Sequence, residues 1–524
     1  MTKYLINRIL RSIVSVMLVV ALVMVLIYSL MDRSLIFAQD PVYSKQANNQ
    51  KVAYRYRKWE EYGYLDYVPY SDWLQDLVRS GELTTEKRDE LAKFGRKAEN
   101  DSEEVAEYVA RFTQEYESKG YEIIRLDAMV SGRKVKTGGS QQLFAYKDKP
   151  LISRVLNYFG GLFTVDNIHS VPEETDIGER KLTFTLYDPM YGGEKFSPAI
   201  LGNGTTHRYL MYCDNKFPYI HQNLLTLNLG KSYVVNAGID VFTTMTRSQG
   251  SYVSSEITYP SGLTEVSADD LHTATYAANS LESNPVFTDR YIDDYTNVDT
   301  VKANLSKMGF SFIIGLIATT MAYLIGVPLG IVMAQHKDGL GDKIGTFYIV
   351  FIMAVPSLAY IFMFKAVGGA LNLPTTFDMQ SKSKAMFILP IISLALPSIG
   401  SLMKWMRRYM IDQMNADYVK FARSGGLTEG EIFRKHIMKN AIIPIAHGIP
   451  ASVLGALTGA IITERVYVVP GAGNLLTTAI NNYDNGVIVG LTLFYATLSV
   501  TAIILGDIVM SLVDPRISFS SKAR

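Results

Sequence analysis

The 524-residue chain has little cysteine and almost no net charge. Cys213 is its only cysteine, so no internal disulfide can form, and any part outside the cell must be stable without one. Lysine and arginine number 51 against 50 aspartate and glutamate, for a net charge of +1. This balance gives no support for nucleic-acid binding, and we expect no nucleic-acid partner.

The chain also lacks a nucleotide-binding motif. No G-x-x-x-x-G-K-[ST] sequence occurs, since the nearest candidate, Gly230-Lys231-Ser232, has Leu225 where the first glycine is required. We therefore expect a protein that is not itself an enzyme, with no catalytic residue, no metal site and no cofactor bound by this chain.

Six long apolar runs are the strongest feature of the sequence. Each is near the roughly 20 residues needed to cross a bilayer, and the first follows basic residues without a signal-peptide cleavage site. We predict spans at 13–31, 310–334, 344–368, 385–403, 442–463 and 486–510. The expected domains are 1–31 with the first span, an external domain at 32–303, and a membrane domain at 304–524 that contains a cytoplasmic loop at 404–441.

The positive-inside rule predicts the orientation of these spans. With both termini in the cytoplasm, the inner segments carry 16 lysine and arginine residues and the short outer loops carry only Lys382, Lys384 and Arg465. Residues 32–303 then lie outside the cell. The expected location is the plasma membrane of a bacterium.

Several of the predicted spans contain proline in their interior. Each proline removes a backbone hydrogen bond, which lipid cannot replace, so neighbouring helices or a water-lined cavity must satisfy the freed carbonyl. This indicates either a bundle around a pathway or ordinary kinked packing. The residues are Pro328, Pro356, Pro390, Pro397 and Pro450.

The external region combines helical and strand patterns. Residues 72–120 favour helices, with Ser71 as the expected N-cap of the first one. From about 121 to 300, segments such as KLTFTLYD alternate apolar and polar residues as half-buried strands do, between glycine-rich and asparagine-rich turns. The many tyrosines fit either a protein interface or core positions. We predict an α+β domain.

The loop from Asp417 to Ile445, DYVKFARSGGLTEGEIFRKHIMKNAIIPI, is the most informative segment. Gly425 and Gly426 break a first helix, and Thr428 with Glu431 forms a capping-box pattern for a second. We expect that helix to run from Glu429 to just before Pro444. Ile432, His436 and Asn440 should share one of its faces. A basic helix resting on lipid head groups is the alternative.

This loop resembles the signature loop of ABC-importer permeases, and most of all its dipeptide and oligopeptide branch, which includes subunits with an enlarged outer region. The matching residues are Asp417, Tyr418, Ala422, Arg423, Gly426, Leu427, His436, Asn440 and Pro444, with Lys420 and Phe421 as departures. Four other segments agree: GVPLGIVMA (326–334), ERVYVVPGAGNLLTTAI (464–480), GDIVMSLVDPRI (506–517) and NLLTLNLGKSY (223–233).

The resemblance implies a membrane all-α bundle of six helices that forms half of a pathway for oligopeptides. It implies as partners a second permease, two cytoplasmic ATPase subunits that bind ATP and magnesium, an external peptide-binding lipoprotein and membrane lipid. The capped helix would seat on an ATPase. Its expected residues are Ala422, Arg423, Gly425, Gly426, Leu427, Thr428, Glu431, Arg434, His436, Asn440 and Pro444.

The pathway and its outer gate are predicted from the kinked spans and the outer Pro-Gly segment. The candidate residues are Pro328, Pro356, Pro397, His447, Pro470, Gly471 and Gly473. Other readings remain: a membrane-anchored sensor or mechanotransmission protein whose external domain binds a protein partner, and an ion-coupled transporter. The latter class usually has inverted repeats and buried carboxylates, and no such repeat is visible.

Overall fold

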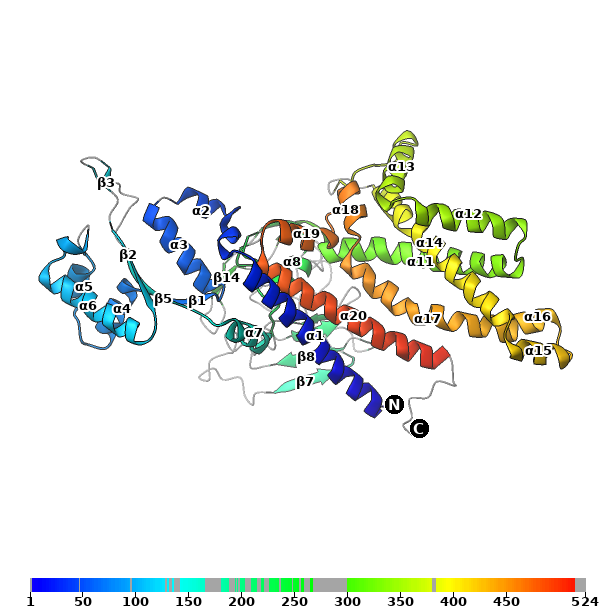
Figure 1. Ribbon diagram of the computed structural model, residues 1–524, viewed down its shortest axis with the longest axis horizontal. Helices are drawn as coiled ribbons and strands as arrows, with labels where there is room; N and C mark the ends of the chain where they lie inside the picture. Colours follow the sequence, from blue (N-terminus) through cyan, green and yellow to red (C-terminus); the bar gives the residue numbers. More distant parts are fainter. Residues whose placement is uncertain are drawn as a thin grey trace.

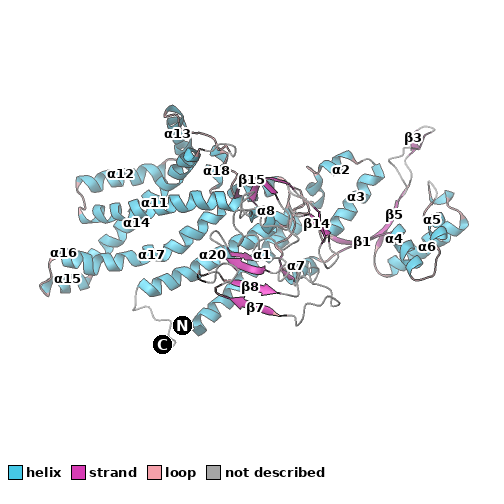
Figure 2. Cartoon of the chain, turned by 180° about the vertical axis from the view of Figure 1, so that it is seen from behind, coloured by secondary structure: helices cyan, strands magenta, loops and turns pink. Residues whose placement is uncertain are grey.

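The molecule is elongated, with a helical bundle at one end and an α/β region at the other (Figures 1 and 2). The computed structural model describes residues 2–127 apart from 47, 95 and 96, and residues 299–513 apart from 379–382. Between these it describes most of 130–164 and shorter stretches of 181–266. The basic residues expected near the C-terminus, 516–524, and Lys382 lie outside the described residues.

Five helices of the described residues are long and apolar enough to cross a membrane, and a bent pair would make a sixth crossing. The five are α1 (Thr2–Leu30), α11 (Lys307–Gln335), α14 (Ile388–Met414), α17 (Met438–Gly455) and α20 (Asn485–Val513). A 3₁₀ turn at Lys384–Phe387 leads into α14, and another at Ala456–Thr458 ends α17. α1 and α20 lie side by side (Figure 1).

The predicted third span, 344–368, is two helices instead of one. α12 (Leu340–Ala354) and α13 (Ser357–Ala370) meet at 107°. Pro356 stands at the break as the residue before α13, where its missing N–H and fixed φ do not disturb a helix. The proline predicted to kink a continuous span therefore separates two helices.

Two glycines allow α11 to pack directly against α14. A side chain at Gly326 would stand 2.9 Å from the carbonyl oxygen of Ile399, and one at Gly330 would stand 2.8 Å from that of Met403. Small residues four apart are the usual means by which membrane helices approach closely. This explains the GVPLG pattern of the sequence.

Of the other prolines predicted to kink spans, Pro390 lies in the first turn of α14, where a helix tolerates proline, so that prediction is wrong, and the rest lie inside helices. Pro328 is within α11, Pro397 within α14, and both Pro444 and Pro450 within α17. The expectation that a helix ends before Pro444 is wrong, because α17 continues through it.

The outermost part of the α/β region is a small lobe built on three antiparallel strands. Their order is β1 (Leu65–Pro69), β5 (Gln142–Asp148) and β2 (Glu122–Leu126). Helices α4 (Tyr70–Arg79), α5 (Thr85–Leu91) and α6 (Glu103–Ser118) pack against them around Trp73 and Phe112. The helical pattern of 72–120 is confirmed, but Ser71 is not the N-cap, because α4 begins at Tyr70 after Pro69.

A second sheet contains the KLTFTLYD segment. Its strand order is β10 (Pro218–Ile220), β9 (Tyr209–Cys213), β8 (Ala199–Gly202) and β7 (Leu182–Thr185), with antiparallel neighbours. The predicted strand is present, but not half-buried, since Leu182 and Phe184 on the edge strand β7 are each 62% exposed.

Short elements complete the region. The helical ones are a 3₁₀ turn at Arg33–Phe37, α2 (Pro41–Lys45), α3 (Asn48–Glu61), a 3₁₀ turn at Ala98–Asn100, α7 (Leu151–Gly160) and α8 (Val241–Thr246). The strands form two-stranded pairs: β3 (Val130–Ser131) with β4 (Lys134–Val135), β6 (Phe163–Thr164) with β11 (Thr226–Leu227), β12 (Ser248–Val253) with β15 (Asp299–Ser306), and β13 (Glu256–Thr258) with β14 (Thr264–Val266).

Tyrosines join this region to the end of the bundle where α1 ends and α20 begins. Tyr64 packs edge-on against Tyr28 of α1, with 5.5 Å between ring centroids, and Tyr62 stacks on Tyr233 at 3.9 Å. Tyr54, Tyr64 and Trp59 are buried in the same cluster. These rings occupy core positions, which was one of the two readings of the tyrosine-rich composition.

Candidate functional site

The loop between α14 and α17 forms two short helices joined by a tight turn. α15 (Asp417–Ser424) ends at Gly425, and Gly426 follows with φ of +82°. That conformation is strained for any residue with a side chain and free for glycine. Residues 404–414 of the predicted loop belong instead to α14, which carries the loop away from the bundle (Figure 1).

A capping box begins the second helix, as the sequence predicts. The Glu431 N–H donates to Thr428 Oγ1 at 3.4 Å, and the Thr428 N–H donates to Glu431 Oε2 at 3.2 Å. Thr428 Oγ1 also donates to Glu431 Oε2 at 2.9 Å, and these bonds hold the pKa of the Glu431 carboxyl below its usual value. The helix start at α16 (Glu429–Glu431) is thus determined locally.

An ion pair crosses the glycine turn and joins the two helices. Arg423 donates from Nε to Glu429 Oε1 at 2.5 Å and from Nη2 to Oε2 at 3.0 Å. The guanidinium lowers the pKa of the Glu429 carboxyl. Both side chains are exposed, so the pair orients the turn without adding much stability.

The second helix contains a π-turn that the sequence did not indicate. Residues Ile432–Ile437 form it, between α16 and α17. The buried positions are Ile432, Ile437, Ala441 and Ile445, which are five, four and four residues apart. The predicted shared face of Ile432, His436 and Asn440 is therefore wrong, because the wider turn places Ile437 beside Ile432 and leaves His436 and Asn440 half-buried.

The loop packs against the ends of the bundle helices that lie next to it. Val419 and Ile432 are buried against Met406 and Met410 of α14 and Ala334 of α11. The bidentate pair of Arg407 with buried Asp342, at 2.5 and 2.7 Å, ties α14 to the start of α12 nearby. A force on the loop would thus be transmitted to α14, α17 and α11.

The outward surface of the loop carries charged side chains of both signs and one large apolar side chain. Phe421 is 76% exposed, and Arg423, Arg434 and Lys435 are also exposed. Ala422 and Leu427 are half-buried beneath this surface, while Gly425, Gly426, Thr428 and Pro444 are exposed and Glu431 is half-buried. All predicted loop residues lie on this unit or at its return into α17.

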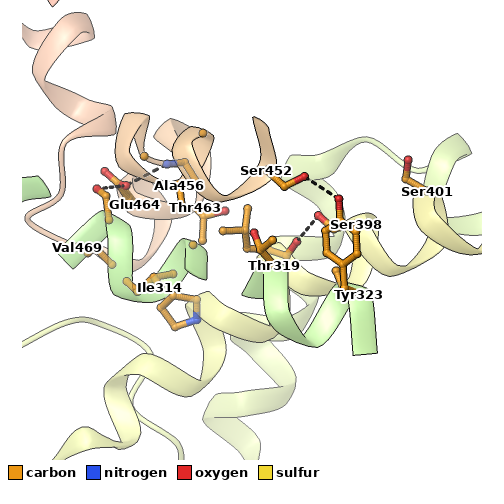
Figure 3. Close-up of a pocket in the computed structure, with 18 of the residues that line it drawn as sticks. Ile314, Thr319, Tyr323, Ser398, Ser401, Ser452, Ala456, Thr463, Glu464 and Val469 are labelled. Atoms are coloured by element: carbon orange, nitrogen blue, oxygen red, sulfur yellow. Dashed lines mark hydrogen bonds between the residues drawn. The ribbon is translucent and has the colours of Figure 1, made fainter. Parts of the chain in front are cut away.

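A cavity of about 340 Å³ lies inside the bundle, between α11, α14, α17 and the segment after α17 (Figure 3). Its lining combines hydroxyl and small side chains with a few larger apolar ones, such as Ile314, Leu394 and Val469, and has one carboxylate at one end. Tyr323 and Ser452 are hydrogen-bonded across it at 3.2 Å. The polar lining residues are Ser311, Thr319, Tyr323, Ser398, Ser401, Ser452, Thr463 and Glu464.

Glu464 is the centre of a buried network that the sequence reading missed. It lies in α18 (Ile461–Tyr467) and accepts from Ser311 Oγ of α11 at 2.7 Å, from the Ala460 N–H at 3.0 Å and from the Gly473 N–H at 2.9 Å. Ser311 Oγ also accepts from the Ala472 N–H at 2.7 Å. The available signal was a carboxylate at the end of an apolar span, a position where charge is rarely left unpaired.

The Pro-Gly segment that follows is fixed by this network. Gly473 begins α19 (Gly473–Asn481), so the carboxylate also lies at a helix N-terminus, where negative charge is favoured. A side chain at Gly471 would overlap the carboxyl group of Glu464. Pro470 and Gly471 line a separate cavity of about 210 Å³ with Lys307 and Thr244.

The other predicted pathway residues lie apart from the cavity between the helices. Pro328, Pro356, Pro397 and His447 are not among its lining residues. His447 instead packs against Gly506, where α17 meets α20. The pathway prediction for these four positions stays a prediction.

A second carboxylate joins the α/β region to the last span. Asp484, fully buried just before α20, accepts from Ser232 Oγ at 2.6 Å and from the N–H groups of Tyr233 and Val234 at 2.8 and 3.2 Å. The partners are some 250 residues away in sequence and lie in or directly after the NLLTLNLGKSY segment. Asp507, at the other end of α20, forms an ion pair with Arg8 of α1.

Among the residues that the structure describes, no group of three or more His, Cys, Asp or Glu side chains is placed to hold a metal ion. The cavity lining offers hydroxyl groups and a single carboxylate that is occupied by its own hydrogen bonds. This arrangement suits a passage for polar molecules better than a reaction centre.

Comparison with known proteins agrees with these features. Residues 326–519 match the family described as "Binding-protein-dependent transport system inner membrane component". The chain is 33% identical to "Oligopeptide transport system permease protein AmiC" of Streptococcus pneumoniae serotype 4, over 100% of this chain and 99% of that protein. Two proteins named "Dipeptide transport system permease protein DppB", from Lactococcus lactis subsp. cremoris and Bacillus subtilis, are 30% and 29% identical over 43% of this chain and 73% of their length.

Proposed function

The chain belongs to the family of binding-protein-dependent transport system inner membrane components, and we propose that it is the AmiC-like subunit that forms one half of an oligopeptide import pathway. Its full-length similarity to an oligopeptide permease carries this proposal. It is a multi-pass membrane protein, and ATP hydrolysis resides in partner subunits. A sensor or mechanotransmission protein, the alternative from the sequence, is not supported by these relatives.

The α14–α17 loop is the part of the chain that couples to an ATPase. It has a fixed shape, from the capping box and the ion pair across the glycine turn, and it is packed against three membrane helices. The exposed aromatic side chain of Phe421 gives it an anchor for a pocket, and exposed Arg434 gives a positive charge for an acidic rim. Movement of an ATPase subunit would shift α14 and α17 together.

The cavity lined by hydroxyl and small side chains is the part of the pathway that this chain contributes. Peptide backbones present amide donors and acceptors, which serine, threonine and tyrosine hydroxyls can bind without regard to the side chains of the peptide. Few charged groups face the cavity, so the passage discriminates little between peptides. A second permease subunit would close the other side.

The Glu464 network acts as the frame of the outer gate. It holds α18, α19 and the start of α11 in one arrangement through bonds that lipid or water cannot easily replace. Pro470, Gly471 and Gly473 are part of this frame rather than free gate residues. An external peptide-binding lipoprotein would deliver its peptide at this end.

The orientation follows from these assignments. The α14–α17 loop faces two cytoplasmic ATPase subunits that bind ATP and magnesium, both termini are cytoplasmic, and residues 32–303 are external. The basic residues on the loop side agree with the positive-inside rule.

Gly426→Val tests the proposal in the assembled transporter. A β-branched residue at φ of +82° would distort the turn, so co-purification of the ATPases through a tag on this chain and uptake of a labelled oligopeptide should both fall sharply. Gly430→Val is the matched control, since this exposed helical glycine has open space around it and a negative φ.

Loss of ATPase binding with Gly426→Val and its retention with Gly430→Val would support the coupling role. Unchanged ATPase recovery and uptake with Gly426→Val would contradict it. Recovery of the wild-type chain without any permease or ATPase partner would refute the transport proposal itself.

A further inference from the structure

Helix α7 of the external region has an apolar face with nothing in the described structure against it. Ile152, Leu156 and Phe163, on and just beyond the helix, are 74%, 64% and 62% exposed. Ile152 and Leu156 are four residues apart, so they lie on one side of α7. A water-soluble helix would normally turn such residues inward.

A neighbouring face of α7 packs against the membrane bundle. Val155, Tyr158 and Phe159 contact the cluster formed by Val16, Val20 and Met24 of α1 with residues of α20. The packed and the exposed apolar residues therefore form adjoining faces of α7, and in the part of the chain that the structure describes protein covers only the packed one. Figure 1 shows α7 beside the end of α1 that lies farthest from the N-terminus.

Two contacts fix the depth of α7 relative to the membrane spans. The guanidinium of Arg154 lies over Tyr28, 3.6 Å from the ring centroid, in the last turn of α1. Tyr158 Oη donates to the Leu229 carbonyl at 3.1 Å, and that carbonyl lies against Gly490, the sixth residue of α20. Six residues of helix correspond to about 9 Å. α7 is therefore level with the outer turns of two membrane-spanning helices.

The residues around α7 match the composition of a membrane–water interface. Tyr28, Tyr64, Tyr158 and Tyr233 surround Arg154, and tyrosines are enriched at this level of membrane proteins. Arg154 is the only charged residue between Pro150 and Thr164, and it points to Tyr28 and Tyr64, away from the exposed face. With ten residues, α7 is about 15 Å long and too short to span a bilayer.

We propose that α7 is an interfacial helix whose Ile152–Leu156–Phe163 face is embedded in lipid, in the leaflet on the side of the α/β region. α1, which α7 contacts, also has an exposed apolar surface, which includes Leu18, Leu22 and Leu26. Because α7 directly follows β5, it would fix the lobe of β1, β5 and β2 to the membrane surface.

This inference goes beyond transport and does not rest on it, since it needs only a chain inserted in a bilayer. The test is spin-label accessibility in the assembled complex in lipid nanodiscs, on a Cys213→Ser background. Ile152→Cys and Leu156→Cys carry the label, and both positions are exposed enough to accept it. Glu82→Cys, on the lobe, is the water reference, and a spin-labelled phospholipid is the hydrocarbon reference.

At both α7 positions, accessibility to oxygen should exceed that to a water-soluble nickel chelate, as for the labelled lipid and opposite to Glu82→Cys. Chelate accessibility equal to that of Glu82→Cys would overturn the proposal, because α7 would then face water. Low accessibility to both probes would also overturn it and would indicate that protein, such as the second permease, covers the face.

Discussion

The two ends of the membrane domain each hold a polar turn in place, but by different means. In the α14–α17 loop the bonds join residues three to six positions apart, and none of the bonded side chains is buried. Around Glu464 and Asp484 the carboxylates are buried, and their partners lie up to 252 residues away. The turn in the α14–α17 loop can form or unfold without changes elsewhere. The segments around Glu464 and Asp484 cannot move without breaking contacts to several helices.

This difference suits the proposed roles. A coupling loop has to keep its own shape while its partner subunit moves, and local bonds achieve that at the surface. An outer frame has to hold separate segments together where water is scarce, and buried charge-assisted bonds are strong there.

Glu464→Ala should be the most damaging change. It leaves the Ser311 hydroxyl and the Ala460 and Gly473 N–H groups without their acceptor, and bonds to a charged group are worth roughly 1.5–3 kcal/mol each. We expect the unfolding free energy to fall by about 3 kcal/mol or more, with loss of uptake, measured by thermal unfolding and transport in proteoliposomes.

Replacing a glutamate carboxylate with the glutamine amide at each end of the membrane domain gives a matched pair of variants. Glu464→Gln should lower the melting temperature clearly, whereas Glu429→Gln at the exposed turn should change it little. Equal effects at the two positions would contradict the distinction between a buried frame and a surface turn.

Ser232→Ala should loosen the attachment of the α/β region to α20. It removes the 2.6 Å bond to Asp484 but leaves the two backbone donors, so the expected loss is about 1 kcal/mol. Faster limited proteolysis of the external region, with the bundle intact, is the measurement. Ser80→Ala, which loses a bond to a carbonyl three residues away, is the control and should not change the rate.

Thr428→Ala should weaken the start of the second loop helix by about 1 kcal/mol, the usual value of an N-cap. Hydrogen exchange should quicken at amides of residues 429–433 and stay unchanged in α19. Thr428→Ser keeps the capping oxygen and should restore protection. Faster exchange at both ends of the domain would show that the loop is not an independent unit.

Arg423→Gln should have the smallest effect, because the ion pair with Glu429 is fully exposed. Because the pKa of Glu429 is lowered in the folded protein, the ion pair contributes to the free energy of unfolding at pH values above the pKa of Glu429 in the unfolded chain, near 4.3. That contribution is lost as the pH falls through the pKa of Glu429 in the folded protein. The stability difference from wild type should therefore vanish in acid, once the pH is below the lowered pKa of Glu429, and also in ~1 M salt. A difference that persists in both conditions would contradict a purely electrostatic role.

Residues near one another in sequence were predicted best. The capping box of Thr428 and Glu431, the break at Gly426 and the helices of the lobe all arise from local backbone preferences, and the structure has them. The wrong predictions concerned short segments too, but ones whose conformation depends on packing against other helices. The π-turn at Ile432–Ile437 and the continuation of α17 through Pro444 depend on how the helix packs against α14, α11 and its neighbours.

By itself the sequence determined that the chain crosses a membrane repeatedly, that an α+β region follows the first span, and that a capped loop precedes α17. These follow from hydropathy and from short-range backbone chemistry, which act within a few residues. Only the tertiary structure decided that Glu464 and Asp484 are buried and bond to distant segments, that Pro356 separates two helices, and that α7 lies level with the ends of α1 and α20. Those facts depend on which distant segments come together. Whether a carboxylate is buried, or an apolar side chain is exposed, is decided by neighbours that are far away in the sequence.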